Sequence, residues 1–404
     1  MSNYDEKINI IGLKAGFLEN SPYAHPILSP FIRDEAECDI LLALPGTAED
    51  LAEKTGYDLE YVREKLVWLN DLVGLCIQHK RPEGWLYTFH SSCTALKDNM
   101  TYHLLYIDDN PVAKDPEHFI TKEKVKNFMC LFTDWTNTEH VDGLWEPRDA
   151  AYKEAMETGN RTFKSPVIRV IPLPGTVKDG TKLHPCEDFD EICRNSDEAG
   201  IYINDCACNW SRHNVTGKTN YEDNYVCLHM SPYGSGIQFE KYKLGNRLTV
   251  DEAIEHGKKV ADRGLVMTAN GGRAVVAQVC CCQSQGCSIL RPIYQKGLHS
   301  CWESRFVPEV DNDKCIGCGK CAKRCPLGCI SMVKDMEYWE KEGKARLIPE
   351  ISDKCFGCGA CVMGCQKDAI GLKCVRDESW LVDCGASDAL DDPYSTGTTF
   401  TSTN

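Results

Sequence analysis

The chain has 404 residues, which is enough for two or three domains of about 100–200 residues each. It carries 45 Lys and Arg against 60 Asp and Glu, and the resulting net charge of −15 disfavours a general nucleic-acid binder, because attraction to phosphates requires cations. No apolar run approaches the ~20 residues of a membrane-spanning helix, and Met1–Lys7 lacks the features of a secretory signal. The composition therefore predicts a multidomain cytoplasmic protein without a membrane span.

Cysteine is unusually frequent, with 25 residues. A secreted disulfide scaffold is typically short and has an even number of cysteines, whereas this chain is long and its count is odd. Metal binding is therefore the better interpretation. Sixteen of the 25 cysteines lie at or beyond Cys280, and only four lie in the first 180 residues, so we expect the metal chemistry in the C-terminal part.

The N-terminal part reads as an arm followed by a small helical domain. Residues 1–35 lack clear periodicity, and we expect them to lie as an arm on another surface. Apolar spacing and capping residues then predict helices over 39–44, 47–56 and 58–72, and two apolar runs within 75–89 predict a hairpin. Helix, helix and hairpin in this order resemble a winged helix-turn-helix.

Such a unit can bind DNA by placing its second helix in the major groove. Here the acidic side chains of Glu60, Glu64 and Asp71 offset Arg63 and Lys65 on that helix. A structural or interaction role is therefore favoured over DNA binding.

The middle of the chain alternates strands and helices. After a connector with aromatic-rich helical patterns, the elements predicted from apolar runs are a strand at 167–172, a helix at 188–199, a strand at 201–204, a helix at 250–263 and a strand at 274–279. This order predicts a small α/β domain. Cysteines follow the second and the last of these strands, so the first metal ligands of this domain are expected at a strand end.

The most specific signal is a Cys-x-x-Cys-x-x-Cys-x-x-x-Cys motif that occurs twice. The two copies comprise Cys315, Cys318, Cys321 and Cys325, and Cys355, Cys358, Cys361 and Cys365. Three thiolates on one loop hold three irons of a 4Fe-4S cluster, while the fourth reaches the other cluster. The expected ligand sets are therefore crossed: Cys315, Cys318, Cys321 and Cys365 for one cluster, and Cys355, Cys358, Cys361 and Cys325 for the other. Zinc is the alternative, but it would leave several of these cysteines unused.

These motifs resemble the bacterial two-cluster ferredoxins over about Val310 to Leu372. The chain departs from that pattern at Gln366, where a proline is usual, and at an insert over 333–351. The insert either forms a docking surface for a partner or is a solvent-exposed addition without a binding role.

A second set of cysteines lies upstream of these motifs. Its six members are Cys206, Cys208, Cys227, Cys280, Cys282 and Cys287. From about Ser165 to Leu372 the chain is similar to a family of ferredoxin-domain proteins from anaerobes, in which a Cys-x-Cys follows a strand and a cysteine-rich knot precedes the ferredoxin domain. The resemblance implies a third Fe-S cluster among the six residues. Packed free thiols and a zinc knot remain as alternatives, and Cys281 is expected to point away from its neighbours.

Neither the glycine fingerprint of dinucleotide-binding folds nor a phosphate-binding loop occurs in the sequence. No nucleophile and base are paired by a recognisable motif, so we expect an electron-transfer subunit rather than a catalytic chain.

The overall expectation is an α+β protein with a winged-helix-like N-terminal domain, a small α/β middle domain and a C-terminal two-cluster ferredoxin domain. The expected divisions are 1–100 for the arm and winged-helix-like domain, 101–164 for a helical connector, 165–309 for the cysteine-rich domain, 310–374 for the ferredoxin domain and 375–404 for a tail. Its expected function is to relay electrons to or from a catalytic oxidoreductase subunit in anaerobic metabolism. The alternative is a redox-responsive regulator that binds DNA through the winged-helix-like domain.

Overall fold

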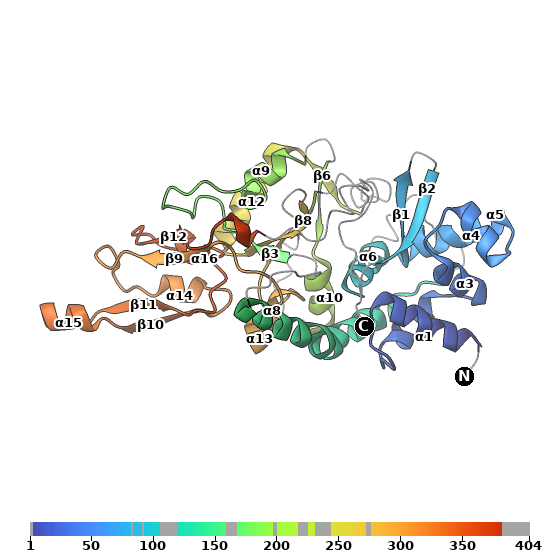
Figure 1. Ribbon diagram of the computed structural model, residues 1–404, viewed down its shortest axis with the longest axis horizontal. Coiled ribbons are helices and arrows are strands. Elements are labelled where there is room, and N and C mark those ends of the chain that lie inside the picture. Colours follow the sequence, from blue (N-terminus) through green and yellow to red (C-terminus); the bar gives the residue numbers. More distant parts are fainter. Residues whose placement is uncertain are drawn as a thin grey trace.

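The computed structural model describes residues 3–81, 84–90, 93–105, 119–158, 168–196, 200–216, 225–230, 244–271 and 276–381. Three units follow one another along the long axis of the molecule. The N-terminal helices lie at the right of Figure 1, a six-stranded sheet lies in the middle, and the C-terminal strands form an arm at the left. None of the helices in these ranges combines the length and the apolar character that a membrane span requires.

The first 35 residues are not an irregular arm. They form helix α1 (Asn3–Ala15) and the short helix α2 (Ala24–Leu28), and α1 packs against both α2 and α3 (Glu35–Ala43). Ile8 and Ile11 of α1 are fully buried in this contact. Because these apolar side chains recur at helical spacing, the segment folds as part of the N-terminal core.

The next elements confirm the predicted order of helix, helix and hairpin. Their bounds are α4 (Ala48–Thr55), α5 (Leu59–Leu66), the π-helical extension η2 (Val67–Leu72), β1 (Cys76–Arg81) and β2 (Gly84–Phe89). Thr47 caps α4 through a capping box with Asp50, and Gly56 ends the helix in the left-handed conformation. Strands β1 and β2 pair antiparallel.

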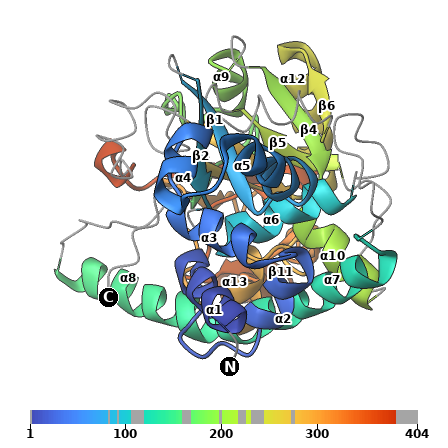
Figure 2. The same cartoon turned by 90° about the vertical axis from the view of Figure 1, so that its right-hand side faces the viewer.

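Helices α6 (Cys93–Leu105) and α7 (Lys122–Asn137) complete the N-terminal core, since α7 buries Phe128 and Phe132 there. A π-helical turn, η3 (Val141–Trp145), and α8 (Glu146–Thr158) follow. Figure 2 shows α8 at the lower left and α7 at the lower right, with α1 and α2 between them at the bottom of the view. The described residues 119–158 are therefore largely helical, and α7 belongs to the N-terminal core.

The middle unit is one antiparallel sheet with the strand order β3-β7-β8-β5-β4-β6. The strands are β3 (Ile168–Val170), β4 (Ile201–Asp205), β5 (Tyr225–His229), β6 (Asn246–Leu248), β7 (Val266–Gly271) and β8 (Val276–Cys282). The helices of this unit are α9 (Phe189–Arg194), α10 (Ala207–Thr216), α12 (Val250–Arg263) and α13 (Leu290–Lys296).

The strand and helix positions were predicted well, but the α/β expectation for this unit is wrong. All described strand pairs in the sheet are antiparallel. Strand β4 pairs with β5 and β6, and it does not form a parallel pair with β3. Strand β8 also extends through Cys282, so three of the cysteines lie within the strand instead of after it. The starts of the predicted strands at 167 and 274 lie outside the described residues.

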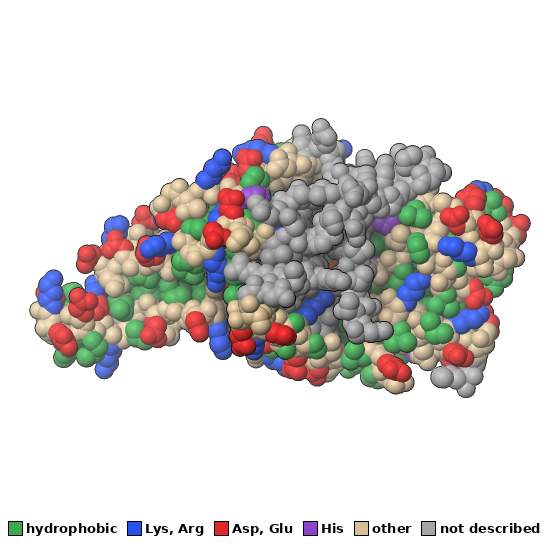
Figure 3. Space-filling view, viewed as in Figure 1, with side chains coloured by type: hydrophobic (Ala, Val, Ile, Leu, Met, Phe, Trp, Pro, Cys, Tyr) green, Lys and Arg blue, Asp and Glu red, His purple; other side chains and the backbone are tan. Residues whose placement is uncertain are grey.

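The C-terminal unit is built from two similar halves. Strand β9 (Phe306–Val310) pairs with β12 (Ile370–Cys374), and β10 (Ile330–Lys334) pairs with β11 (Leu347–Ile351). A short helix follows each cysteine loop: α14 (Lys320–Arg324) and α16 (Ala360–Met363). The insert forms α15 (Met336–Glu342), which buries none of its residues. Acidic and basic side chains are interspersed over this arm (Figure 3).

Candidate metal centre

Glycines shape both cysteine loops of the C-terminal unit. Gly317 and Gly357 have φ values of 66° and 68°, in the left-handed region. A Cβ at Gly317 would lie 2.4 Å from the carbonyl oxygen of Leu347, and a Cβ at Gly357 would lie 2.0 Å from that of Phe306. Each loop therefore winds closely against the strand beside it, which only glycine permits.

The two halves repeat the same contacts around their fourth cysteines. The backbone N–H of Cys329 donates to Cys325 Sγ at 3.2 Å, and the N–H of Ala369 donates to Cys365 Sγ at 3.3 Å. Hydrogen bonds from backbone N–H groups to sulfur stabilise a thiolate. Each fourth cysteine thus accepts an equivalent backbone hydrogen bond, although Gln366 replaces the expected proline in the second half. The Cys325 sulfur is in addition bonded to the Cys329 thiol, and the second half has Ala369 at that position.

Backbone hydrogen bonds bring the end of each motif beside the start of the other. The N–H of Ser352 donates to the carbonyl of Cys329 at 2.9 Å, just before the second motif begins. The N–H of Asp311 donates to the carbonyl of Ala369 at 2.8 Å, just before the first motif begins. This exchange is the arrangement that crossed ligand sets require.

Electrostatic interactions among the thiols agree with the crossed ligand set expected at the second motif. Burial raises the pKa of Cys358 to about 12, and Cys355 and Cys325 contribute to this shift. The pKa of Cys361 is also raised, first by burial and then by Cys358, Cys355, Cys325 and Cys321. Of the first-motif cysteines, only Cys325 also adds to the burial effect that raises the pKa of Cys355 and of Cys358. Cys325, from the first motif, therefore lies among the three cysteines of the second.

The sheet of the middle unit brings the upstream cysteines together. Strand β5 lies between β4 and β8, and Cys227 on β5 is the direct partner of Cys280 on β8. Cys206 follows the end of β4 next to them, and Cys287 lies in the turn after β8. We refer to Cys206, Cys208, Cys227, Cys280, Cys282 and Cys287 as the six-cysteine cluster.

Hydrogen bonds connect the members of this cluster to one another. Cys206 bonds to Cys208, Cys227 and Cys282, and these bonds lower its pKa well below the ordinary value. Cys227 also bonds to Cys280 and Cys282, and Cys282 also bonds to Cys287. Cys206, Cys227 and Cys282 are therefore mutually bonded, while each of the other three is attached to one of them. Cys281 bonds to none of these and is fully buried on β8, in keeping with the alternation of side chains along a strand.

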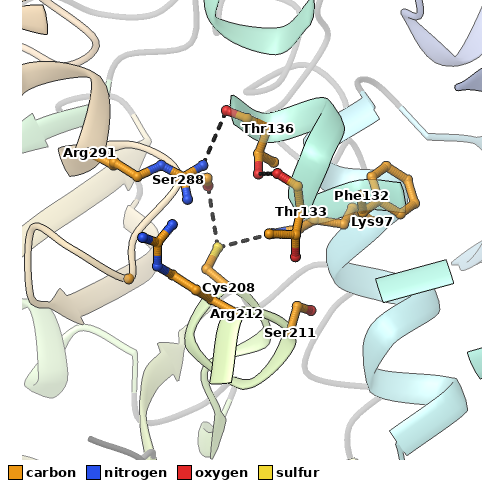
Figure 4. A pocket seen from close by; sticks show the side chains of 10 residues that line it. Lys97, Phe132, Thr133, Thr136, Cys208, Ser211, Arg212, Ser288 and Arg291 are labelled. Carbon is orange, nitrogen blue, oxygen red and sulfur yellow. Dashed lines mark hydrogen bonds between the residues drawn. The ribbon is translucent and has the colours of Figure 1, made fainter. Parts of the chain in front are cut away.

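Cys208 has polar partners outside the cluster. Lys97 on α6 donates from Nζ to Cys208 Sγ at 3.0 Å, and the Ser288 hydroxyl lies 3.3 Å from the same sulfur (Figure 4). Burial by itself would lower the pKa of Lys97, but Asp98, 2.7 Å from its Nζ, and Cys208 raise it above the ordinary value. The ammonium group is therefore charged, and it ties the N-terminal unit to the cysteine cluster.

Among the residues that the structure describes, no group of three or more His, Cys, Asp or Glu side chains is arranged around a position for a single metal ion. This holds for the C-terminal motifs as well as for the six-cysteine cluster, where the thiols bond to one another. Donor chemistry nevertheless fits Fe-S clusters at both places, because cysteine sulfur is the ligand that such clusters use.

Cys329 is bonded to Cys325, whereas several of the other cysteines are packed thiols. Cys76 and Cys93 are buried in the N-terminal unit, and Cys186 and Cys193 are buried beside α9. Cys301 is buried, which raises the pKa of its thiol, and Glu303 and Cys287 add to the shift. Cys384 lies outside the described residues.

Sequence reasoning missed the cations beside Cys208. Lys97 and Arg291 are 2% and 3% exposed, and Arg212 lies in the same pocket. No motif surrounds any of them, and Lys97 lies far from Cys208 in the sequence. Of the three cations, only Arg291 lies close in sequence to a predicted ligand, because it follows Cys287 in the run Cys287-Ser288-Ile289-Leu290-Arg291.

Comparison with known proteins identifies the C-terminal unit. A family model described as the 4Fe-4S dicluster domain matches residues 314–370. Over 57 residues the chain is 35% identical to the pyruvate synthase subunit PorD of Methanothermobacter thermautotrophicus, covering 14% of this chain and 69% of that protein. The PorD subunit of Methanothermobacter marburgensis matches with the same values. No solved structure matches the chain. Through residues 314–370, the chain belongs to the family of 4Fe-4S dicluster domain proteins.

Proposed function

We propose that this chain is an electron-transfer subunit that holds two 4Fe-4S clusters in its C-terminal unit. The ligand sets are Cys315, Cys318, Cys321 and Cys365 for one cluster and Cys355, Cys358, Cys361 and Cys325 for the other. The single observation that carries this proposal is the position of Cys325 among the cysteines of the second motif. When bound, such clusters accept and donate electrons one at a time.

A third Fe-S cluster is proposed for the six-cysteine cluster. The three mutually bonded thiols of Cys206, Cys227 and Cys282 supply three ligands, and their hydrogen bonds would be replaced by bonds to iron. Cys287 is the best fourth ligand, because it is buried and bonded to Cys282, whereas Cys208 is engaged by Lys97 and Cys280 is half-buried. A zinc knot would use the same thiols. Metal analysis distinguishes the two possibilities, because one site would contain zinc and the other iron.

Contacts between the units support an electron path between these places. The N–H of Leu173 donates to the carbonyl of Cys358 at 3.0 Å, so the middle unit packs directly on the second motif. Glu303 interacts electrostatically with both Cys301 and Cys355, and Cys301 interacts with Cys287. One short stretch of chain, from Cys287 to Glu303, therefore links the two cysteine sites.

A catalytic oxidoreductase subunit is the proposed partner. The name of the similar PorD proteins, pyruvate synthase subunit, describes chains that act within a larger enzyme. The absence of any catalytic motif in the present sequence agrees with such a role. Native purification should therefore recover this chain together with a larger oxidoreductase.

DNA binding through a winged-helix-like domain is the less favoured proposal. Helix α5 would be the recognition helix, but Arg63 on it is ion-paired with Glu49 and Glu60, both at 2.7 Å or less. Lys65 is buried and ion-paired with Asp34 and Glu37. With its cations paired to acids of the same unit, α5 offers little attraction to phosphate. Sequence-selective retention of the cluster-loaded protein on DNA at low salt would favour the regulator instead.

We retain the proposed division into an N-terminal domain, a cysteine-rich middle domain from residue 165 and a ferredoxin domain over 310–374. The apolar cores suggest one change, since α7 packs with the N-terminal core and Trp145 packs with the middle one. The boundary inside the connector is therefore best placed near residue 138.

Anaerobic metal analysis tests the proposal. The purified chain should contain about eight irons if it holds two clusters and about twelve if it holds three, with matching acid-labile sulfide. Reduction with dithionite should produce the electron paramagnetic resonance signals of reduced 4Fe-4S clusters. Zinc as the dominant metal in an anaerobic preparation would refute the assignment.

A further inference from the structure

We propose that the thiol of Cys329 donates a hydrogen bond to the cluster ligand Cys325 and thereby raises the reduction potential of one of the two ferredoxin clusters. We call the cluster proposed for Cys355, Cys358, Cys361 and Cys325 the second-motif cluster, and the other the first-motif cluster. Cys329 belongs to neither ligand set, and the repeated cysteine motif does not include it. The inference rests on the proposed electron-transfer function and adds a residue that acts on one cluster through its ligand.

The turn after the first motif holds Cys329 next to Cys325. The backbone N–H of Cys329 donates to Cys325 Sγ at 3.2 Å, and its side-chain thiol is hydrogen-bonded to the same sulfur. The residue is 8% exposed. Its carbonyl accepts from the N–H of Ser352 at 2.9 Å, just before the second motif begins. The thiol is therefore fixed beside the proposed fourth ligand of the second-motif cluster.

The direction of the thiol hydrogen bond follows from the chemistry of a cluster ligand. A cysteine bound to iron is a thiolate, which has no proton to donate, so Cys329 is the donor. Two other acceptors lie within reach of its S–H, because Cys329 Sγ is 3.3 Å from the carbonyl oxygen of Lys354 and 3.6 Å from that of Leu327. Rotation about the Cβ–Sγ bond turns the hydrogen between these oxygens and Cys325 Sγ.

The other half of the C-terminal unit has the same backbone contacts without the thiol. Ala369 lies at the equivalent position: its N–H donates to Cys365 Sγ at 3.3 Å, and its carbonyl accepts from the N–H of Asp311 at 2.8 Å. A methyl group offers no hydrogen-bond donor. The backbone hydrogen bond is therefore common to both fourth ligands, whereas the thiol hydrogen bond belongs to Cys325 alone.

A donor beside a ligand sulfur favours the reduced cluster. When one electron arrives from the redox partner, the negative charge on the ligand sulfurs increases, and a hydrogen bond to such a sulfur becomes stronger. Hydrogen bonds to sulfur are among the factors that set the potential of an Fe-S cluster. The proton stays on Cys329 throughout, so no bond breaks and the S–H group only turns toward Cys325. Because a thiol is a weak donor, the effect is moderate.

The difference in exposure between the two ligand sets gives this hydrogen bond a purpose. Cys318 of the first set is exposed, whereas no member of the second set is. Burial disfavours the added negative charge and lowers the potential of the second-motif cluster. The donor at Cys329 opposes that effect. It acts at the cluster next to the middle unit, where the N–H of Leu173 bonds to the carbonyl of Cys358.

The test uses the anaerobically purified full-length chain and four single variants. Cys329→Ala removes the donor, Cys329→Ser keeps a donor on a side chain of similar size, and Ala369→Cys introduces a thiol in the other half. Cys374→Ala is the matched control, because Cys374 is another thiol of the C-terminal unit outside the ligand sets, and it donates to the Arg376 carbonyl at 3.2 Å. Redox titration followed by electron paramagnetic resonance measures the potentials of both clusters.

We expect Cys329→Ala to shift the equilibrium of one cluster about threefold to tenfold toward the oxidised form, which lowers its potential by about 30–60 mV for a one-electron couple. The other cluster should keep its potential. Cys329→Ser should stay close to the wild-type value, Ala369→Cys should raise the potential of the cluster that Cys329→Ala leaves unchanged, and Cys374→Ala should change neither.

Equal potentials in the wild type and Cys329→Ala would overturn the proposal. An equal decrease in Cys329→Ala and Cys329→Ser would also overturn it, because packing of the thiol would then explain the effect. If Cys329→Ala loses its cluster, Ala369→Cys decides: a raised potential supports the proposal, and an unchanged one refutes it.

Iron and sulfide analysis of the same samples separates this outcome from that of the proposed function. About eight or more irons in the wild type, together with a potential that does not respond to Cys329→Ala, would refute the role of Cys329 and leave the electron-transfer function in place. A wild-type chain without clusters would refute both.

Discussion

Cys227 lies directly opposite Cys280 on neighbouring antiparallel strands, and this single register defines the cysteine cluster of the middle unit. Cys282, two residues beyond Cys280, points to the same face of β8, which leaves Cys281 on the other face. A shift of the β5 and β8 pairing by one residue would exchange these faces and separate the thiols.

The first prediction compares Cys282→Ser with Cys281→Ser. Cys282 bonds to Cys206, Cys227 and Cys287, so its replacement should lower the iron content by about four per chain while the clusters of residues 314–370 persist. Cys281→Ser is the matched control and should keep the full iron content. Equal iron in the two variants, measured with acid-labile sulfide, would show that the six-cysteine cluster holds no Fe-S centre.

The second prediction concerns the crossed ligand sets. Cys325→Ser should alter the cluster held by Cys355, Cys358 and Cys361, because Cys325 lies among those residues. Electron paramagnetic resonance of the reduced protein should lose or shift one ferredoxin signal and retain the other, and Cys365→Ser should affect the opposite signal. Cys130→Ser, on α7, serves as the control. A loss of the same signal in both motif variants would contradict the crossing.

The third prediction compares two glycines of the C-terminal unit with similar left-handed backbone. Gly357→Ala should destabilise the unit by more than about 3 kcal/mol, because its Cβ would lie 2.0 Å from the Phe306 carbonyl oxygen and the φ of 68° is also unfavourable. Gly343→Ala, with a φ of 64° and no atom within 4 Å, should cost only about 1 kcal/mol. Thermal unfolding followed by cluster absorbance measures both. Equal shifts in melting temperature would show that the close approach is unimportant.

The fourth prediction concerns His90, which is buried and has a pKa lowered to about 4 by that burial. Its Nε2 donates to the Gly74 carbonyl at 2.8 Å, while its Nδ1 is buried without a partner, so a second proton would have no acceptor. The unfolded chain binds this proton below its ordinary pKa of 6.5 and the folded chain does not. Stability is therefore complete above pH 6.5 and is lost as the pH falls toward 4, by roughly 1.4 kcal/mol per pH unit.

His90→Gln should flatten this dependence. Between pH 6.5 and pH 5 the wild-type protein should lose about 2 kcal/mol more of its unfolding free energy than the variant does. Urea unfolding followed by circular dichroism measures the difference, and His25→Gln, at a partly exposed histidine on α2 that lies 3.0 Å from Asp5, is the control. A variant with the same pH dependence as the wild type would show that His90 takes up no proton on unfolding in this range.

Local signals in the sequence were sufficient for much of the fold. Thr47 and Gly56 delimit α4 because capping depends on residues only a few positions apart. Gly264 ends α12 for the same reason. The N-terminal helix α1 was missed, because the spacing of Ile8, Ile11 and Ala15 is recognisable as a buried face only once α2 and α3 pack on it.

Sheet topology could not be predicted from the order of the elements. A strand, a helix and a strand in sequence are compatible with a parallel crossover, but β4 instead pairs antiparallel with β5 and β6. Strand pairing depends on contacts between residues that are distant in the chain, and periodicity within one strand carries no information about its neighbour.

The sequence by itself determined the chemistry of the C-terminal unit, because the spacing of its eight cysteines lies within two short segments and matches the geometry of Fe-S ligation. It also named the six upstream cysteines. Only the tertiary structure decided how those six are connected, and that Lys97 from the N-terminal unit and Arg291 from α13 line one pocket with Cys208. Such a meeting is fixed by the packing of whole units on one another, and no local pattern in the chain encodes it.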